Sequence, residues 1–123
     1  MITKQEAFNR AWQYFIKERH NPSTTHDHWS CLYRSPTGMK CAVGLLIPNE
    51  EYSRDFEGMP LEDVFDQVPT LCDSPDLSVS YLRDLQQCHD EFASSPSLFH
   101  TGMENKMRAL AIRWNLSLPE GVK

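Results

Sequence analysis

Two histidines and two cysteines in the first half of the chain offer the ligand types that zinc prefers. They are His26, His28, Cys31 and Cys41. Structural zinc sites use four nitrogen or sulfur ligands, usually delivered as pairs a few residues apart. The spacing from His28 to Cys31 fits such a pair, whereas Cys31 and Cys41 lie too far apart to form the second one. We therefore favour the other interpretation, solvated histidines and buried thiols, and predict no metal or cofactor.

A cysteine nucleophile activated by histidine is the second chemical hypothesis. Cys31, Cys41 or Cys88 would need a base that lowers the thiol pKa, and His89 is the best candidate. However, His89 lies on the apolar face of a predicted helix, where a histidine usually belongs to the core and hydrogen-bonds a backbone or carboxylate group. No glycine-rich oxyanion loop or triad motif accompanies these residues. The sequence favours a protein that is not an enzyme, with Cys41 and His89 as the alternative catalytic pair.

The dipeptide His89-Asp90 is similar to the metal-binding pair of HD phosphohydrolases. That chemistry requires further histidines and aspartates on other helices, and Asp73, Asp84 and His100 lack a convincing spacing for it. Neighbouring residues on a helix point about 100° apart, so we expect Asp90 to face water.

Carboxylates are concentrated between Asn49 and Asp66, where Arg54 is the one basic residue. Aromatic and methionine side chains are interspersed among them. The segment is either a solvated connector whose aromatic residues pack on the core, or a partner-binding surface with apolar anchors bordered by charge. Phe56 is expected in the core. For the binding surface, the predicted contact residues are Glu50, Glu51, Tyr52 and Asp55.

Length and charge narrow the class of protein. The chain has 123 residues, a net charge of −5 and an isoelectric point of about 5.4. An acidic chain lacks the basic surface that neutralises phosphates, so direct nucleic-acid binding is not expected. No apolar run approaches the roughly 20 residues of a membrane span, and the N-terminus lacks the apolar region of a signal peptide. We expect a cytoplasmic protein with four reduced cysteines; its oligomeric state stays open.

Apolar residues at helical spacing predict three main helices. The first begins at a capping box formed by Thr3 and Glu6, and the last begins at a second such box, formed by Thr101 and Glu104. The middle helix is expected to begin at Ser74-Pro75. The three predicted ranges are 3–20, 74–94 and 101–114, and shorter helical turns are expected at 48–52 and 60–65, with 68–74 as a loop.

Residues 29–47 predict a small β-hairpin. Residues 29–34 alternate like a strand, and the turn at 35–38 places Gly38 at a positive φ. Residues 40–47 fit a strand or a helix, and we favour a strand that passes into a helical turn near Pro48. Gly44 should mark the close approach of another backbone. The expected fold is α+β: one mainly helical domain over residues 1–123, with a hairpin at 29–47 and a mobile tail at 116–123.

The same region carries a family resemblance. Its pattern is Cys31-x-Tyr33-Arg34, followed by Gly38-x-Lys40-Cys41-Ala42-Val43-Gly44-x-Leu46-Ile47-Pro48-x-Glu50-Glu51-Tyr52. This pattern resembles a group of small uncharacterised phage and bacterial proteins, and the resemblance brings no catalytic residues. It implies a phage or prophage setting, in which small acidic proteins often block a host protein. The predicted function is that of an acidic protein-binding protein, a phage-encoded inhibitor of a host or anti-phage defence factor. The alternative is a small enzyme or zinc module that uses Cys31, Cys41 and His89.

Overall fold

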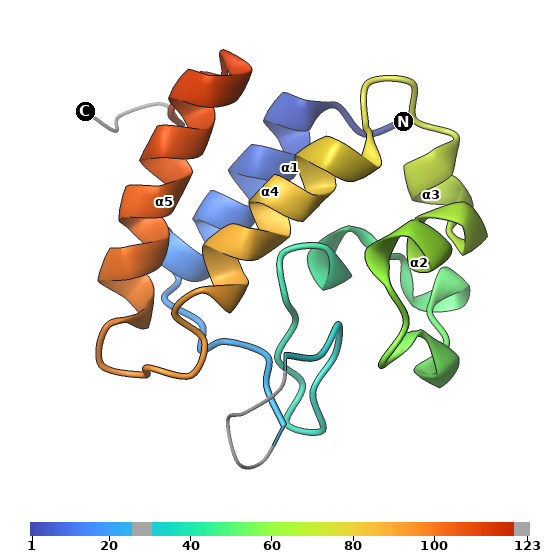
Figure 1. Ribbon diagram of the computed structural model, residues 1–123, viewed down its shortest axis with the longest axis horizontal. Helices are drawn as coiled ribbons and strands as arrows, with labels where there is room; N and C mark the ends of the chain where they lie inside the picture. Colours follow the sequence, from blue (N-terminus) through green and yellow to red (C-terminus); the bar gives the residue numbers. More distant parts are fainter. Residues whose placement is uncertain (26–30, 120–123) are drawn as a thin grey trace.

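The computed structural model describes residues 1–25 and 31–119 of this chain. Three main helices pack together in one half of the molecule (Figure 1). They are α1 (Lys4–Ala11), which continues as the π-helical turn η1 (Trp12–Lys17), α4 (Val79–Asp90) and α5 (Phe99–Trp114). The short helices α2 (Leu61–Gln67) and α3 (Pro69–Cys72) lie on the other side of α4. The chain forms the 3₁₀ turn η2 (Gly44–Leu46) between the two groups, and the 3₁₀ turns η3 (Asn49–Glu51) and η4 (Arg54–Phe56) on the side where α2 lies (Figure 1).

The predicted α+β class is wrong, because the described residues contain helices and no strand. At residues 29–47 the described part shows two isolated bridges, Thr24 with Cys31 and Arg34 with Lys40. Beyond Lys40 the chain turns inward: the amide of Leu45 donates to the carbonyl of Cys41 at 3.0 Å, as in a helical turn. Nearly the whole run from Cys41 to Ile47 is buried, so it does not alternate between core and solvent as a half-buried strand would.

The predicted start of the first helix agrees with the structure, whereas the predicted starts of the middle and last helices do not. Thr3 caps α1, as predicted: its hydroxyl accepts a hydrogen bond from the Glu6 amide at 3.0 Å. The middle helix begins at Ser78, whose hydroxyl accepts from the Tyr81 amide, rather than at Ser74. The buried Ser74 hydroxyl instead accepts from the Ile2 amide at 2.9 Å, which ties the N-terminus to α3. The capping box predicted at Thr101 is also wrong, because α5 already begins at Phe99, and α3 occupies a predicted loop.

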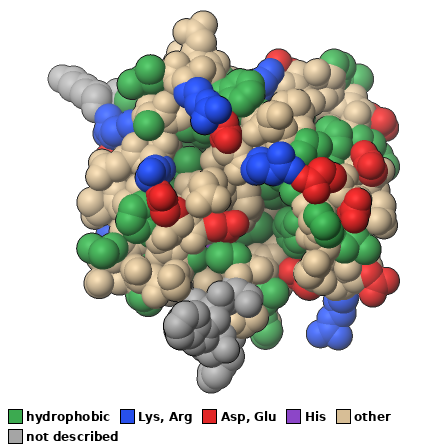
Figure 2. Space-filling view, in the orientation of Figure 1, with side chains coloured by type: hydrophobic (Ala, Val, Ile, Leu, Met, Phe, Trp, Pro, Cys, Tyr) green, Lys and Arg blue, Asp and Glu red, His purple; other side chains and the backbone are tan. Residues whose placement is uncertain are grey.

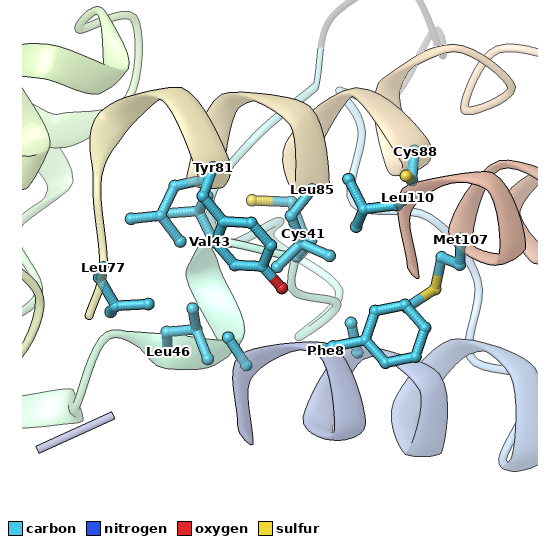
Figure 3. Packing of buried hydrophobic residues seen from close by; sticks show 14 of the residues in the cluster. Phe8, Cys41, Val43, Leu46, Leu77, Tyr81, Leu85, Cys88, Met107 and Leu110 are labelled. Atoms are coloured by element: carbon cyan, nitrogen blue, oxygen red, sulfur yellow. The ribbon is translucent and has the colours of Figure 1, made fainter. Parts of the chain in front are cut away.

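One apolar core joins the two groups of helices. The run that begins at Cys41 packs beneath α4, beside Tyr81 and Leu85, and Phe8 and Met107 extend the core toward α1 and α5 (Figure 3). Phe56 is buried, as expected. Burial of these apolar side chains stabilises the fold by about 25 cal/mol for each Å² of apolar surface removed from water. The same burial holds the 41–47 segment against α4.

Two glycines, Gly38 and Gly44, fix the course of the chain between Tyr33 and η2. Gly38 has a φ of +87°, and Gly44 packs directly against the backbone of Tyr33; both predictions are confirmed. A Cβ atom on Gly44 would lie 2.1 Å from the Tyr33 carbonyl oxygen. This contact places the segment after Cys31 against η2.

The end of the described chain lies on α1. Ser117 and Gln5 exchange two hydrogen bonds of 2.8 Å between the Ser117 backbone and the Gln5 amide group. Leu116 and Leu118 pack against the core, and residues 120–123 lie outside the described part. Within residues 1–25 and 31–119, no helix is long and apolar enough to cross a membrane.

Candidate functional site

A pocket of about 350 Å³ lies where the Cys31–Cys41 segment meets α4 and the turn after η4. It brings together two of the cysteines singled out in the sequence, which are ten positions apart in the chain. Its lining residues are Cys31, Leu32, Tyr33, Cys41, Gly58, Met59, Pro60, Gln86 and Asp90. The Gly44–Tyr33 contact and the C-terminal turn of α4 position this pocket.

His89 lies behind this pocket, fully buried between the rings of Phe15 and Phe99. Its Nε2 atom accepts a hydrogen bond from the Ser23 amide at 2.9 Å, and its Nδ1 atom lies 2.8 Å from Oδ1 of Asp90. A backbone N–H can only donate, so Nε2 carries no proton and Nδ1–H donates to Asp90. His89 is thus a core histidine that hydrogen-bonds backbone and carboxylate groups, as predicted.

Asp90 was expected to face water; its side chain is partly exposed and also lines the pocket, where it accepts hydrogen bonds. Its Oδ1 atom accepts from His89 and from the Gln86 side-chain amide, at 2.8 and 2.7 Å. Gln86 in turn accepts from the Val43 amide at 2.9 Å. This chain of hydrogen bonds connects the C-terminal turn of α4 to the buried segment beneath it.

The cysteine thiols here are held in their protonated form. Cys31 is exposed, so the predicted buried thiol is wrong at this position, whereas Cys41 is buried as predicted. Partial burial of the Cys31 thiol, together with the charge of Asp90 and a hydrogen bond to it, raises the pKa of Cys31 to about 12. Burial also raises the pKa of Cys41, whose sulfur accepts from the Gly44 amide at 3.3 Å. For Cys88, burial and Asp84 raise the pKa to about 12. A cysteine nucleophile requires a lowered pKa, so this geometry does not favour the enzyme alternative built on Cys31, Cys41 and His89.

Donor atoms of Cys31, His89 and Asp90 all lie within 4.8 Å of one another, which raises the question of a metal ion. Ligation through Nδ1 of His89 would move its proton to Nε2. That proton would then face the Ser23 N–H, so two donors would oppose each other in a buried position. The three groups therefore do not fit a metal as they stand. His26 and His28, candidate ligands in the alternative zinc hypothesis, lie outside the described residues.

Two carboxylates of the acidic segment hold the fold together. Glu57 accepts from the amides of Tyr33 and Arg34 at 2.8 and 3.0 Å and from the Tyr52 hydroxyl at 2.5 Å. Glu51 accepts from the amide and hydroxyl of Thr70, at 2.9 and 2.5 Å. Tyr52 is half-buried, and the Arg34 guanidinium lies over its ring, with the Cζ atom 4.4 Å from the ring centre. Glu51 and Tyr52, two of the predicted contact residues, thus already have partners within the chain.

The other carboxylates of this segment are exposed on η3, η4 and α2. They are Glu50, Asp55, Glu62, Asp63 and Asp66, and we call this set the acidic face. Glu62 forms an ion pair with Arg83 of α4. Figure 2 shows acidic and hydrophobic side chains intermixed over the part of the molecule where α2 lies. The half-buried apolar residues here are Met59, Leu61 and Phe65.

A second, larger cavity of about 760 Å³ opens at the other end of the acidic segment. Leu45, Ile47 and Pro48 supply apolar lining, and Arg10 and Glu50 are among its charged lining residues. The sequence pattern did not reveal this groove, because its walls come from the N-terminus, η2 and α3. It also missed Glu57 and Gln86, whose importance depends on partners distant in the chain.

Searches of protein-family models, curated proteins and solved structures find no match for this chain.

Proposed function

We propose that this protein binds another protein through the acidic face and does not catalyse a reaction. The observation that carries this proposal is that exposed carboxylates and cavity-lining apolar residues occur in the same segment, residues 49–66. The groove of about 760 Å³ includes Glu50, and the pocket of about 350 Å³ includes Met59 and Pro60. Apolar surface bordered by charge is the composition of an interface core and its rim.

The charge of the face defines the partner. Exposed carboxylates attract a basic surface, increase the association rate and select against acidic partners. Glu50 and Asp55 are the predicted contact residues that are exposed. Glu51 and Tyr52 support the face from below through their bonds to Thr70 and Glu57.

The biological setting of the proposal comes from the sequence resemblance. Small acidic proteins of phages often act by occupying a surface of a host protein. We therefore propose a host or anti-phage defence factor in the cytoplasm as the partner, with inhibition as the result of binding. A protein whose basic surface normally holds nucleic acid would satisfy the charge requirement.

Charge reversal at matched positions tests this function. One variant combines Glu50→Lys with Asp55→Lys on the acidic face. The control variant combines Glu18→Lys with Glu91→Lys, two exposed residues outside the acidic face, and has the same net charge. Each protein is used as bait in bacterial extract, and the captured protein is then purified for association kinetics at low and high salt.

We expect the acidic-face variant to associate at least about tenfold more slowly at low salt, while the control variant stays near the wild-type rate. The difference should shrink at high salt, because salt screens exposed charges beyond about 8 Å. Equal rates for the two variants would exclude the acidic face as the binding surface.

A further inference from the structure

We propose that the pocket between Tyr33 and Asp90 binds the cationic end of a basic side chain, an arginine guanidinium or a lysine ammonium, presented by the protein partner. This inference rests on the proposed function and adds a specific contact to it. The pocket adjoins the acidic face through Gly58, Met59 and Pro60, so one partner can cover both.

The charge of the pocket comes from Asp90. Among the described residues that line the cavity, it is the one acidic or basic residue, and 36% of its side chain is exposed. The groups among the described residues that hydrogen-bond to it, His89, Gln86 and Cys31, are neutral donors and bring no positive charge to the carboxylate. Over residues 1–25 and 31–119, no lysine or arginine forms an ion pair with this carboxylate.

The negative charge of Asp90 raises the pKa values of other side chains in the pocket. Burial is the main cause of the raised pKa values of Cys31 and Tyr33, both about 12, and Asp90 adds to each shift. Burial and the charge of Asp90 also raise the pKa of Cys41. The contribution of Asp90 to these shifts is the part that favours a cation, because a carboxylate repels an anion and attracts a positive charge.

The lining suits the rest of a long basic side chain. Two hydrogen bonds hold Tyr33 in place. Its backbone amide donates to the Glu57 carboxylate, and its hydroxyl donates to the Met59 carbonyl at 3.2 Å. An aromatic ring near a cation contributes attraction through its π electrons. Leu32, Met59 and Pro60 offer apolar contact for the methylene groups of lysine or arginine.

A basic side chain fits better than a metal ion. Binding of a metal through His89 would break its bond to Ser23, as described above. An ammonium or guanidinium group donates directly to the Asp90 carboxylate and leaves both nitrogens of His89 as they are.

The inference can be tested on the full chain without the partner. N-acetyl-arginine amide and N-acetyl-lysine amide are titrated into the ¹⁵N-labelled protein, with N-acetyl-norleucine amide as the neutral control. We expect the two cationic probes to shift the amide signals of Tyr33, Met59 and Asp90, and the neutral probe to leave them in place. Asp90→Asn should weaken binding of the cationic probes by about tenfold or more, because it removes a charged hydrogen-bond acceptor.

Asp90→Asn keeps an oxygen that can accept from His89 and Gln86, so the variant should remain folded. Glu18→Gln removes the same charge from an exposed position outside both the pocket and the acidic face, and should leave binding of both probes unchanged. Equal shifts from norleucine amide, or unchanged binding by Asp90→Asn, would overturn the inference. Metal is checked in parallel: stoichiometric Zn²⁺ binding that Asp90→Asn abolishes would also overturn it.

The partner measurement distinguishes this inference from the proposed function. If the probes bind and Asp90→Asn slows dissociation of the partner or leaves it unchanged, the occupant is not a partner side chain and the inference fails. If Asp90→Asn speeds dissociation of the partner, the inference is supported. Failure of the acidic-face variants, by contrast, contradicts the proposed function and leaves the probe titration intact.

Discussion

The Nε2 atom of His89 accepts a hydrogen bond of 2.9 Å from the backbone amide of Ser23, and both residues are buried. This bond fixes the tautomer of the histidine and joins α4 to the segment that follows η1. It also makes His89 a structural residue: one nitrogen serves the backbone and the other serves Asp90. The consequence for the pocket is that its carboxylate is held in place from behind.

Replacement of His89 by alanine should destabilise the fold by about 3 kcal/mol. The change leaves the buried Ser23 amide without a partner and opens a cavity between Phe15 and Phe99. Urea unfolding monitored by circular dichroism measures the effect. Gln87→Ala, an exposed change in the same helix, should stay within about 0.5 kcal/mol. A stable His89→Ala variant would contradict the structural role.

Two glycine variants separate close packing from backbone strain. Gly44→Ala should be the more harmful, by about 2 kcal/mol or more, because its Cβ would overlap the Tyr33 carbonyl and backbone must move. Gly38→Ala meets no atom within 4 Å, so it should cost about 1 kcal/mol for its positive φ alone. Thermal unfolding of the two proteins gives the order, and a reversed order would show that the Gly44–Tyr33 contact is not tight.

The sequence predicted local features better than contacts between distant segments. Thr3 acts as a cap because Glu6, its partner, lies three positions away. Ser74, followed by Pro75, was the predicted cap of the middle helix, but its hydroxyl accepts from Ile2 across the fold and α4 begins later. Residues 40–47 could not be assigned from period, because nearly every side chain in the run is buried. For the site, Asp90 was expected in water because helix geometry alone says nothing about its bonds to His89 and Gln86.

Glu57 and Asp55 provide a test of which carboxylates hold the fold. Glu57→Gln should destabilise the protein by about 1–3 kcal/mol, since an amide group cannot accept at both positions where Glu57 now does. Asp55→Asn should stay within about 0.5 kcal/mol because its side chain is exposed. Chemical denaturation is the measurement. Equal losses would mean that Glu57 is not the anchor of the Tyr33–Arg34 segment.

Alkaline pH should weaken the fold through its tyrosines. Burial raises the pKa of Tyr33 to about 12, and burial with the Glu57 hydrogen bond does the same for Tyr52. The folded state thus holds these protons more tightly than the unfolded state, where the pKa is near 10. Their contribution is complete below pH 10 and is lost as the pH rises toward 12. Unfolding free energies measured from pH 8 to 11.5 should fall. The unfolding free energy of the Tyr52→Phe variant should fall less steeply with pH than that of the wild type. An equal slope for the two proteins would contradict the raised pKa of Tyr52.

The reactivity of Cys31 is the sharpest test of the enzyme alternative. With its pKa near 12, the thiolate fraction of Cys31 at pH 8 is about three orders of magnitude below that of a free cysteine. The greater intrinsic nucleophilicity of such a thiolate recovers part of this loss. We expect alkylation by iodoacetamide to be about a hundredfold slower than for free cysteine, as followed by mass spectrometry of the peptide that contains Cys31. Asp90→Asn should speed the reaction, because it removes the carboxylate that disfavours the thiolate. Fast alkylation of the wild-type Cys31 at neutral pH would instead indicate an activated thiol, and the hypothesis of a cysteine enzyme would then be preferred to that of a binding protein.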